Sequence, residues 1–393
     1  MKIELLNARE NFPEIFKESL ERFLVRYANW PGSLCWGAGE GLQFRQNAQL
    51  NVIYPVTLPR KLLDEVTREF RYHPSLLRRL AQNTYAGLAV RNPLESVTAP
   101  VMFTITAPPG DMKEWVFIPG NHSIRIIDFR RQSSMVFPKA GFDIEMTCRD
   151  AAIRQRFPFL LAPRVADAPE HNAWYIEERV RGLPLNRMPQ SAQRAAAEAR
   201  AVGSLCRLYL ETRVSEGVDR YLDQLFRELD ALFVRTGSRM PPDFLAKLRS
   251  FKERAGSVVA SSGQEQVVIV QSHGDFQPAN ILVDGEEVNI IDWEYSKPRS
   301  EAYDYLVYMS SSRFAVGLEA RLAQLLNTAR ANGGLKSWFI NHHANIERYF
   351  ALFLLEELSL KLQESAAGAL HDTSWNLVQW LPEVEPFLAR LHD

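Results

Sequence analysis

One stretch of the sequence, residues 266–295, concentrates side chains that could carry out chemistry. The apolar run QVVIV is followed by a loop containing Asp275 and Asn280, and a second apolar run ends at Asp292. A carboxylate can orient a hydroxyl that attacks a phosphoryl group, while a second carboxylate and an amide oxygen can hold Mg²⁺ against nucleotide phosphates. Oxygen ligands at loop and strand ends suit this hard cation. These residue types in this order therefore indicate phosphoryl transfer.

The same residues form two recognisable motifs. His273–Leu282 (HGDFQPANIL) resembles the catalytic loop of aminoglycoside phosphotransferases and choline/ethanolamine kinases, and Ile291–Tyr295 (IDWEY) resembles their metal-binding strand end. The resemblance implies Asp275 as catalytic base, Asn280 and Asp292 as Mg²⁺ ligands, and ATP or GTP as the phosphoryl donor. Either motif alone could be an ordinary turn or cap. Their order and their twelve-residue separation favour the family.

Two further segments resemble parts of the same family, and the resemblance extends over residues 98–390. Tyr303–Leu306 is similar to the aspartate-plus-apolar segment that anchors the helix after the metal-binding strand. Trp174–Leu185 (WYIEERVRGLPL) resembles the hinge strand and the element after it. Backbone groups around Glu178 are therefore expected to bind adenine.

The resemblance also implies a nucleotide cradle built from three strands. The runs EWVFI, IRIIDF and SSMVF alternate with turns, and the Gly120–Asn121 turn would lie over the phosphates. Lys139, at the end of the third strand, would neutralise the phosphates, and a glutamate from the next helix would hold it. Glu145 is the candidate for that partner, and Asp150 is the alternative.

The fold class that follows is α+β, a protein-kinase-like fold with two lobes. We expect a small antiparallel-sheet lobe over residues 96–181 and a larger, mainly helical lobe over residues 182–393 with the catalytic and metal-binding loops. Residues 1–95 match no pattern of this family. Apolar residues recur there every three or four positions, as in LPRKLLDEVTREF, which predicts an N-terminal helical extension.

Composition limits the class of protein and its partners. The chain has 393 residues and a formal net charge of −1, which argues against a general nucleic-acid binder. Its three scattered cysteines are typical of reduced thiols in the cytoplasm. No apolar run approaches membrane-spanning length, so we expect no integral membrane association. The basic run at residues 71–79 could meet an anionic acceptor or could be a solvated helix face.

The resulting hypothesis is a Mg²⁺-dependent phosphotransferase that moves the γ-phosphoryl group of ATP or GTP to a hydroxyl of a small molecule. The acceptor could be a sugar or glycan precursor, an aminoglycoside or an amino alcohol, and the oligomeric state is open. One alternative is a nucleotide-binding pseudokinase that acts as a scaffold or regulator. Another is nucleotidyl transfer on the same fold.

Overall fold

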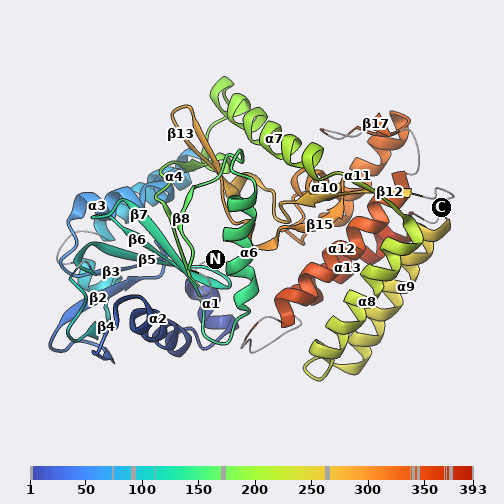
Figure 1. Ribbon diagram of the computed structural model, residues 1–393. Helices are drawn as coiled ribbons and strands as arrows, with labels where there is room; N and C mark the ends of the chain where they lie inside the picture. Colours follow the sequence, from blue (N-terminus) through green and yellow to red (C-terminus); the bar gives the residue numbers. More distant parts are fainter. Residues whose placement is uncertain are drawn as a thin grey trace. The chain divides into compact units, whose positions relative to one another are not determined.

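The computed structural model describes residues 3–72, 75–89, 94–110, 112–169, 174–261, 266–336, 338, 341–342, 346–366, 368, 370 and 375–391. The chain forms two compact units (Figure 1). Unit 1 comprises Met1–Ala201 and Ala279–Ile291, and unit 2 comprises Val202–Pro278 and Asp292–Asp393.

Unit 1 is built on a nine-stranded antiparallel sheet with strand order β1-β4-β2-β3-β5-β6-β7-β9-β8. The strands are β1 (Leu34–Trp36), β2 (Leu42–Asn47), β3 (Val52–Pro55), β4 (Val101–Ile105), β5 (Trp115–Pro119), β6 (Ser123–Asp128), β7 (Ser133–Pro138), β8 (Val165–Asp167) and β9 (Tyr175–Glu178). The β-branched and aromatic residues of these runs alternate in and out of the two faces, as a pleated strand requires. A small second sheet contains β10 (Leu183–Pro184), β13 (Ile281–Asp284) and β14 (Glu287–Ile290).

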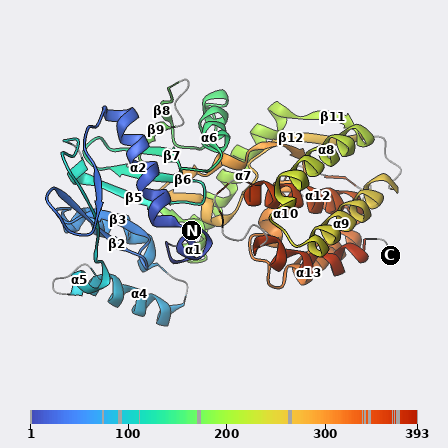
Figure 2. The ribbon, with the colours of Figure 1, turned by 90° about the horizontal axis from the view of Figure 1, so that it is seen from below.

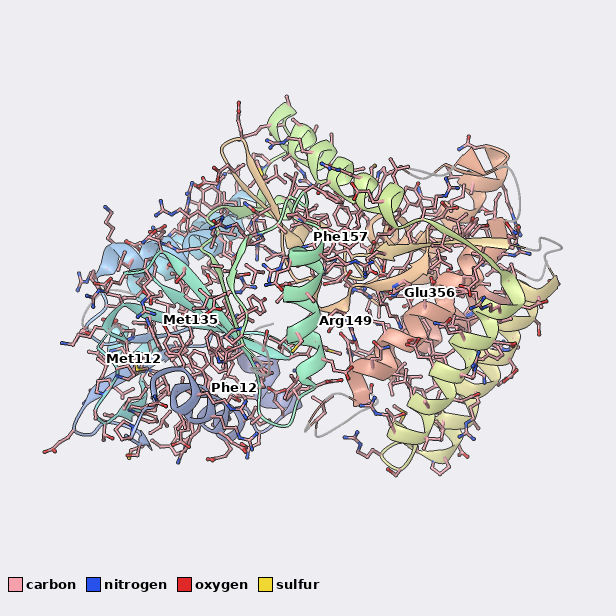
Figure 3. All side chains as sticks on the ribbon, viewed as in Figure 1. Phe12, Met112, Met135, Arg149, Phe157 and Glu356 are labelled. Carbon is pink, nitrogen blue, oxygen red and sulfur yellow. The ribbon has the colours of Figure 1, made fainter. Side chains whose placement is uncertain are left out.

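Helices cover both faces of the large sheet (Figure 1). On one face, α2 (Phe12–Ala28) buries its phenylalanines against Phe44, Phe103 and Phe117. Figure 3 labels three members of this core, Phe12, Met112 and Met135. On the other face, α6 (Ile144–Arg156) packs against Val136 and Tyr175. The remaining helical elements of this unit are α1 (Ile3–Arg9), α3 (Arg60–Val66), η1 (Arg68–Arg71), α4 (Leu76–Ala89), α5 (Leu94–Thr98), η2 (Met112–Glu114), η3 (Leu185–Arg187) and η4 (Pro278–Asn280), whose first residue belongs to unit 2.

The N-terminal residues differ from the expectation of a helical extension. Helices do form at α2 and α3, but residues 34–55 supply three strands of the same sheet that holds β5, β6 and β7. The runs LQFRQN and VIYP bury alternate or successive side chains, and β3 pairs with β5. The backbone N–H and C=O groups of a short strand form their hydrogen bonds with residues far away in the sequence. The helical spacing elsewhere in this segment therefore did not predict the strands. The first 95 residues are therefore an integral part of unit 1.

Unit 2 is mainly helical. Its strands β11 (Val214–Gly217), β12 (Gln266–Ser272) and β15 (Lys297–Ser300) form one sheet, and β16 (Leu335–Lys336) pairs with β17 (Asn341–His342). Its helical elements are α8 (Val218–Gly237), α9 (Pro242–Ser261), η5 (Trp293–Tyr295), α10 (Tyr303–Ser310), α11 (Leu318–Ala331), α12 (Ile346–Ala366) and α13 (Trp375–Ala389). The helix α7 (Ala192–Thr212) runs from unit 1 into unit 2.

Helix α12 forms the centre of unit 2. It is buried on all sides between α8, α9, α10, α11 and α13, as its nearly continuous apolar sequence predicts. Two adjacent carboxylates, Glu356 and Glu357, interrupt that sequence and are themselves buried. Among the described residues, no helix is long and apolar enough to span a membrane.

The α+β class is confirmed, with an antiparallel-sheet unit and a mainly helical unit. The boundaries differ from those expected at residues 95 and 181. The sheet unit continues to Ala201 and also takes in the hairpin at 279–291, because β13 pairs with β10 and Ile290 donates its amide to Leu161.

Candidate active site

The loop after β12 is held from behind by Asp304 of α10. This buried carboxylate accepts hydrogen bonds from the amides of His273 (2.7 Å) and Gly274 (2.9 Å) and from the hydroxyl of Tyr209 (2.8 Å). Gly274 has φ +89°, and a Cβ there would lie 2.3 Å from the carbonyl oxygen of Tyr295. The HGD sequence thus needs glycine at its centre for both conformation and space. The predicted anchoring segment around Asp304 supports the loop directly.

His273 is a structural member of this loop. Its ring is buried, lies 4.4 Å from the ring of Trp293, and accepts at Nδ1 a hydrogen bond from the amide of Asp275 (3.1 Å). The imidazole therefore fixes the backbone that carries Asp275.

Two side chains position the carboxylate of Asp275. Arg313 Nε lies 2.5 Å from Oδ1, and Gln277 Nε2 lies 2.9 Å from Oδ2. Arg313 also donates to the carbonyl of Gly274 (2.6 Å) and to Glu357 Oε2 (2.8 Å). The carboxylate of Asp275 keeps 14% of its side-chain surface exposed. It is thus fixed in orientation while still reachable from solvent.

The buried Glu357 makes the position of Arg313 possible. Burial alone would raise the pKa of Glu357, but Arg313 and Lys361 hold it below its ordinary value, and Tyr303 donates a hydrogen bond to it. Burial would lower the pKa of Arg313, but the carboxylates of Glu357 and Asp275 hold it well above its ordinary value. Both groups are therefore charged around neutral pH.

Sequence reasoning missed Arg313, Glu356 and Glu357. The only signal was the pair of glutamates within the apolar run of α12, because charged residues are rarely fully buried unless they are paired. Glu356, labelled in Figure 3, accepts hydrogen bonds from the amide and hydroxyl of Ser300 and from Tyr221. It fixes the end of β15, while Glu357 holds Arg313.

Asp292 lies two residues after the end of β14 and has a left-handed conformation, with φ 64° and ψ 56°. A non-glycine residue in this region is uncommon, although aspartate tolerates it better than most, and such residues gather at functional sites. The next residue, Trp293, is fully buried and so anchors the backbone that carries Asp292.

Asn280 ends the short turn before the β13–β14 hairpin of unit 1. Its carbonyl accepts the amide of Ile291 (3.0 Å), and its side chain is largely buried. Within the described part of the chain, no group of three or more His, Cys, Asp or Glu side chains could hold a metal ion. Asn280 and Asp292 carry an amide oxygen and a carboxylate, donor types that Mg²⁺ accepts alongside phosphate and water.

The prediction that Glu145 or Asp150 pairs with Lys139 was wrong. Its Nζ lies 2.5 Å from Oε1 of Glu10, and both side chains are fully buried. Glu145 is exposed, and Asp150 instead pairs with Arg154 (3.0 Å) and accepts the hydroxyl of Tyr175 (2.8 Å).

Strand alternation explains this difference. In β7, Val136 points to the α6 face, whereas Phe137 lies one residue on and stacks on Phe23 of α2 at 4.4 Å. Lys139 has the same parity as Phe137, so it lies on the α2 face, with its ammonium 4.9 Å from the ring of Phe142. A glutamate on α6 is on the opposite face of the sheet.

Two arginines occupy the α6 face. Arg125 of β6 and Arg154 of α6 both pair with Glu177 of β9, the latter at 2.7 Å. Arg125 keeps 23% of its side chain exposed, whereas Arg154 is buried. Cations positioned by a carboxylate are thus present on this face, but they are arginines from other elements.

The expected phosphate turn and hinge have protein partners in the structure. The amide of Gly120 donates to Ser123 (2.9 Å), and the carbonyl of Asn121 accepts from Arg9 (2.8 Å). The amide of Glu178 donates to Arg164 (2.9 Å), and its side chain is exposed. Helix α1 thus braces the β5–β6 turn, which the sequence analysis did not anticipate.

Comparison with known proteins confirms the recognised resemblance. Residues 150–338 match the model of the phosphotransferase enzyme family. This match includes the catalytic loop and the metal-binding strand end, and it supports a small-molecule phosphotransferase with a kinase-like fold.

Among solved structures, an ethanolamine kinase from Plasmodium vivax is similar at 13% identity, covering 84% of this chain and 96% of that one, with a TM-score of 0.46. A choline/ethanolamine kinase family protein from Mesorhizobium loti is similar at 15% identity, with coverages of 80% and 94% and a TM-score of 0.40. The aminoglycoside phosphotransferase APH(3'')-Id from Streptomyces rimosus is similar at 16% identity, with coverages of 64% and 94% and a TM-score of 0.40. Among curated proteins, none matches the chain.

Proposed function

We propose that this chain transfers the γ-phosphoryl group of ATP or GTP to a hydroxyl of a small molecule, with Asp275 as the catalytic base. The observation that carries the proposal is the carboxylate of Asp275, held by Arg313 and Gln277 yet still partly exposed. A carboxylate fixed at both oxygens can align an incoming hydroxyl without reorganising, which is how positioning lowers the barrier to phosphoryl transfer.

The proposed reaction involves one bond exchange. The acceptor oxygen forms a bond to the γ-phosphorus, and the bond from that phosphorus to the β–γ bridging oxygen breaks. The hydroxyl proton passes to the carboxylate of Asp275, and the nucleoside diphosphate leaves with the electron pair of the broken bond. Mg²⁺ held by Asn280 and Asp292 would supply positive charge to the nucleotide phosphates.

The cation proposed to contact the nucleotide phosphates in unit 1 is not Lys139, which the sequence had indicated. Because Lys139 is buried on the α2 face, we assign the cationic role to Arg125, positioned by Glu177. Arginine suits this role because its planar guanidinium can pair with phosphate oxygens in a bidentate manner. The Gly120–Asn121 turn and the backbone near Glu178 remain the proposed contacts for phosphate and adenine.

The acceptor is drawn from three classes: sugar or glycan precursors, aminoglycosides and amino alcohols. Tyr295 donates a hydrogen bond to Glu364 (2.8 Å), and burial together with the carboxylates of Glu364, Glu294 and Asp275 raises its pKa well above the ordinary value. Asp275 and Glu364 are both partly exposed, so an acceptor that carries an amine would find a carboxylate to pair with.

The test is an acceptor screen that measures nucleoside diphosphate release and product mass for wild type, Asp275→Asn and the exposed control Asp223→Asn. Phosphotransfer predicts a product heavier by one phosphate, made by wild type and the control but not by Asp275→Asn. Full turnover by Asp275→Asn contradicts the base assignment. A product heavier by a nucleoside monophosphate favours nucleotidyl transfer, and nucleotide binding without any product favours the pseudokinase alternative.

A further inference from the structure

Helix α4 of unit 1 exposes an unusual amount of apolar surface. Leu76, Leu77 and Leu80 are 65%, 80% and 64% exposed, and Leu88 is 44% exposed. Single exposed leucines are ordinary on protein surfaces, but three within five residues on one helix form a patch. Val97 of α5, which packs beside α4, is 78% exposed and extends the patch.

The leucines share one side of the helix. Positions 76, 80, 84 and 88 are four residues apart, so they form one stripe along α4, with position 77 beside it. Only Ala86 and Ala89 of this helix are buried, both in its C-terminal half. Every residue from 75 to 81 is exposed, so the first turns of α4 extend beyond the core of unit 1 (Figure 2).

Helix α4 itself carries only basic charges. Arg78 and Arg79 are exposed between the leucines, and α4 contains no acidic residue. The neighbouring η1 and α3 carry both signs: Arg68, Arg60 and Lys61 are exposed, but so is Glu69, and Asp64 pairs with Arg71. Leucines and arginines therefore alternate within the same turns of one exposed helix.

This combination identifies the kind of surface that α4 fits. A lipid headgroup boundary accepts leucines into the acyl region while arginines extend their charged ends to anionic headgroups. A second copy of the chain is disfavoured, because a two-fold contact through the leucines would leave Arg78 and Arg79, which lie on the other side of the helix, without an opposite charge. An acidic groove of another protein would fit α4 only if its apolar pockets and carboxylates matched the spacing of these leucines and arginines.

We propose that α4 docks unit 1 onto an anionic lipid surface, with the leucines inserted and the arginines at the headgroups. The interaction is peripheral and is carried by the leucines and the two arginines of α4. It is independent of the proposed phosphotransfer, because none of these residues takes part in the assigned chemistry.

The test is flotation of the full chain with vesicles of phosphatidylcholine alone or mixed with phosphatidylglycerol. Wild type is expected to float with the mixed vesicles and much less with the neutral ones. The triple variant Leu76→Ser/Leu77→Ser/Leu80→Ser should lose at least tenfold in vesicle partitioning. Arg78→Gln/Arg79→Gln should lose about fivefold per arginine, because each basic residue near an anionic surface contributes about 1 kcal/mol.

The matched control is Leu210→Ser/Val234→Ser, which removes side chains that are 73% and 78% exposed on α7 and α8. Partitioning equal to wild type in this control, with loss in the α4 variants, supports the proposal. No flotation of wild type overturns it, as does equal flotation of wild type and the triple-serine variant. The proposal is also overturned if flotation is the same with neutral and anionic vesicles and is unchanged by the arginine substitutions. A concentration-dependent dimer lost in the triple-serine variant, without vesicle binding, identifies self-association instead.

Discussion

The guanidinium of Arg313 connects Asp275 to the helix at the centre of unit 2. Its Nε lies 2.5 Å from Asp275 Oδ1, and Glu357 Oε2 of α12 lies 2.8 Å from its Nη1. Glu357 is fully buried, so it is fixed by the packing of α12. The orientation of Asp275 is thereby determined by a helix that begins about seventy residues later in the sequence.

Arg313→Met is expected to destabilise the fold and to slow turnover. Glu357 would be left buried without its cation, which typically costs about 3–5 kcal/mol, and a misplaced Asp275 would lower kcat by about a hundredfold. The double variant Arg313→Met/Glu357→Gln should recover most of the stability but not kcat. Chemical denaturation and steady-state kinetics measure the two effects. Equal recovery of both in the double variant would show that Arg313 acts on stability alone.

Gly274→Ala is expected to be much more damaging than Gly333→Ala. Both glycines have positive φ, so both alanines carry backbone strain of roughly 1–2 kcal/mol. Only at residue 274 does the added Cβ meet the backbone of Tyr295, whereas nothing lies within 4 Å at residue 333. Thermal unfolding should therefore show a clearly larger decrease in Tm for Gly274→Ala, together with loss of turnover. Similar Tm values for the two variants would contradict the close approach.

The two basic positions of unit 1 should separate stability from nucleotide binding. Lys139→Met removes one of the two cations that pair with the buried Glu10, Arg9 being the other, and is expected to cost about 1.5–3 kcal/mol of unfolding free energy. Arg125→Met should unfold near the wild-type temperature but lose the stabilisation by Mg-nucleotide, which at a hundred times Kd is about 2.7 kcal/mol.

Thermal unfolding with and without Mg-ATP and Mg-GTP measures both effects. The control is Arg22→Met, an exposed arginine of α2 in the same unit, which should retain the nucleotide shift. If Lys139→Met/Glu10→Gln folds well but binds no nucleotide while Arg125→Met binds normally, the lysine is the phosphate contact after all.

Acid should destabilise unit 1 through His122. Burial, followed by the charges of Arg9 and Lys139, lowers its pKa from 6.5 to about 3. The unfolded chain therefore binds a proton between these values that the folded chain does not. His122 thus contributes its full stability above pH 6.5 and loses about 1.4 kcal/mol per pH unit as the pH falls toward 3.

The measurement is the unfolding free energy of wild type and His122→Asn between pH 5 and pH 8. The difference between the two proteins should be constant above pH 6.5 and should change below it in the direction that disfavours wild type. A difference that stays constant down to pH 5 would show that His122 is protonated in the folded chain.

The sequence predicted those features whose cause is local. The strands β5, β6 and β7 and the helix α6 follow from alternating and helical spacing within short runs. The catalytic-loop and strand-end motifs lie close together in the sequence, so their resemblance to a phosphotransferase family could be recognised, and that resemblance implied Asp275, Asn280 and Asp292. Their roles remain predictions, which the experiments above address.

Tertiary structure decided which distant groups meet. Lys139 pairs with Glu10, 129 residues away, and Arg313 with Glu357, 44 residues away. No local period encodes such pairs, because their partners are selected by the packing of whole elements and by the cost of leaving a buried charge unpaired. The strands of residues 34–55 are of the same kind, since they form by pairing with β4 and β5. The sequence alone thus determined the chemistry-bearing residue types and their order, whereas long-range burial determined their partners.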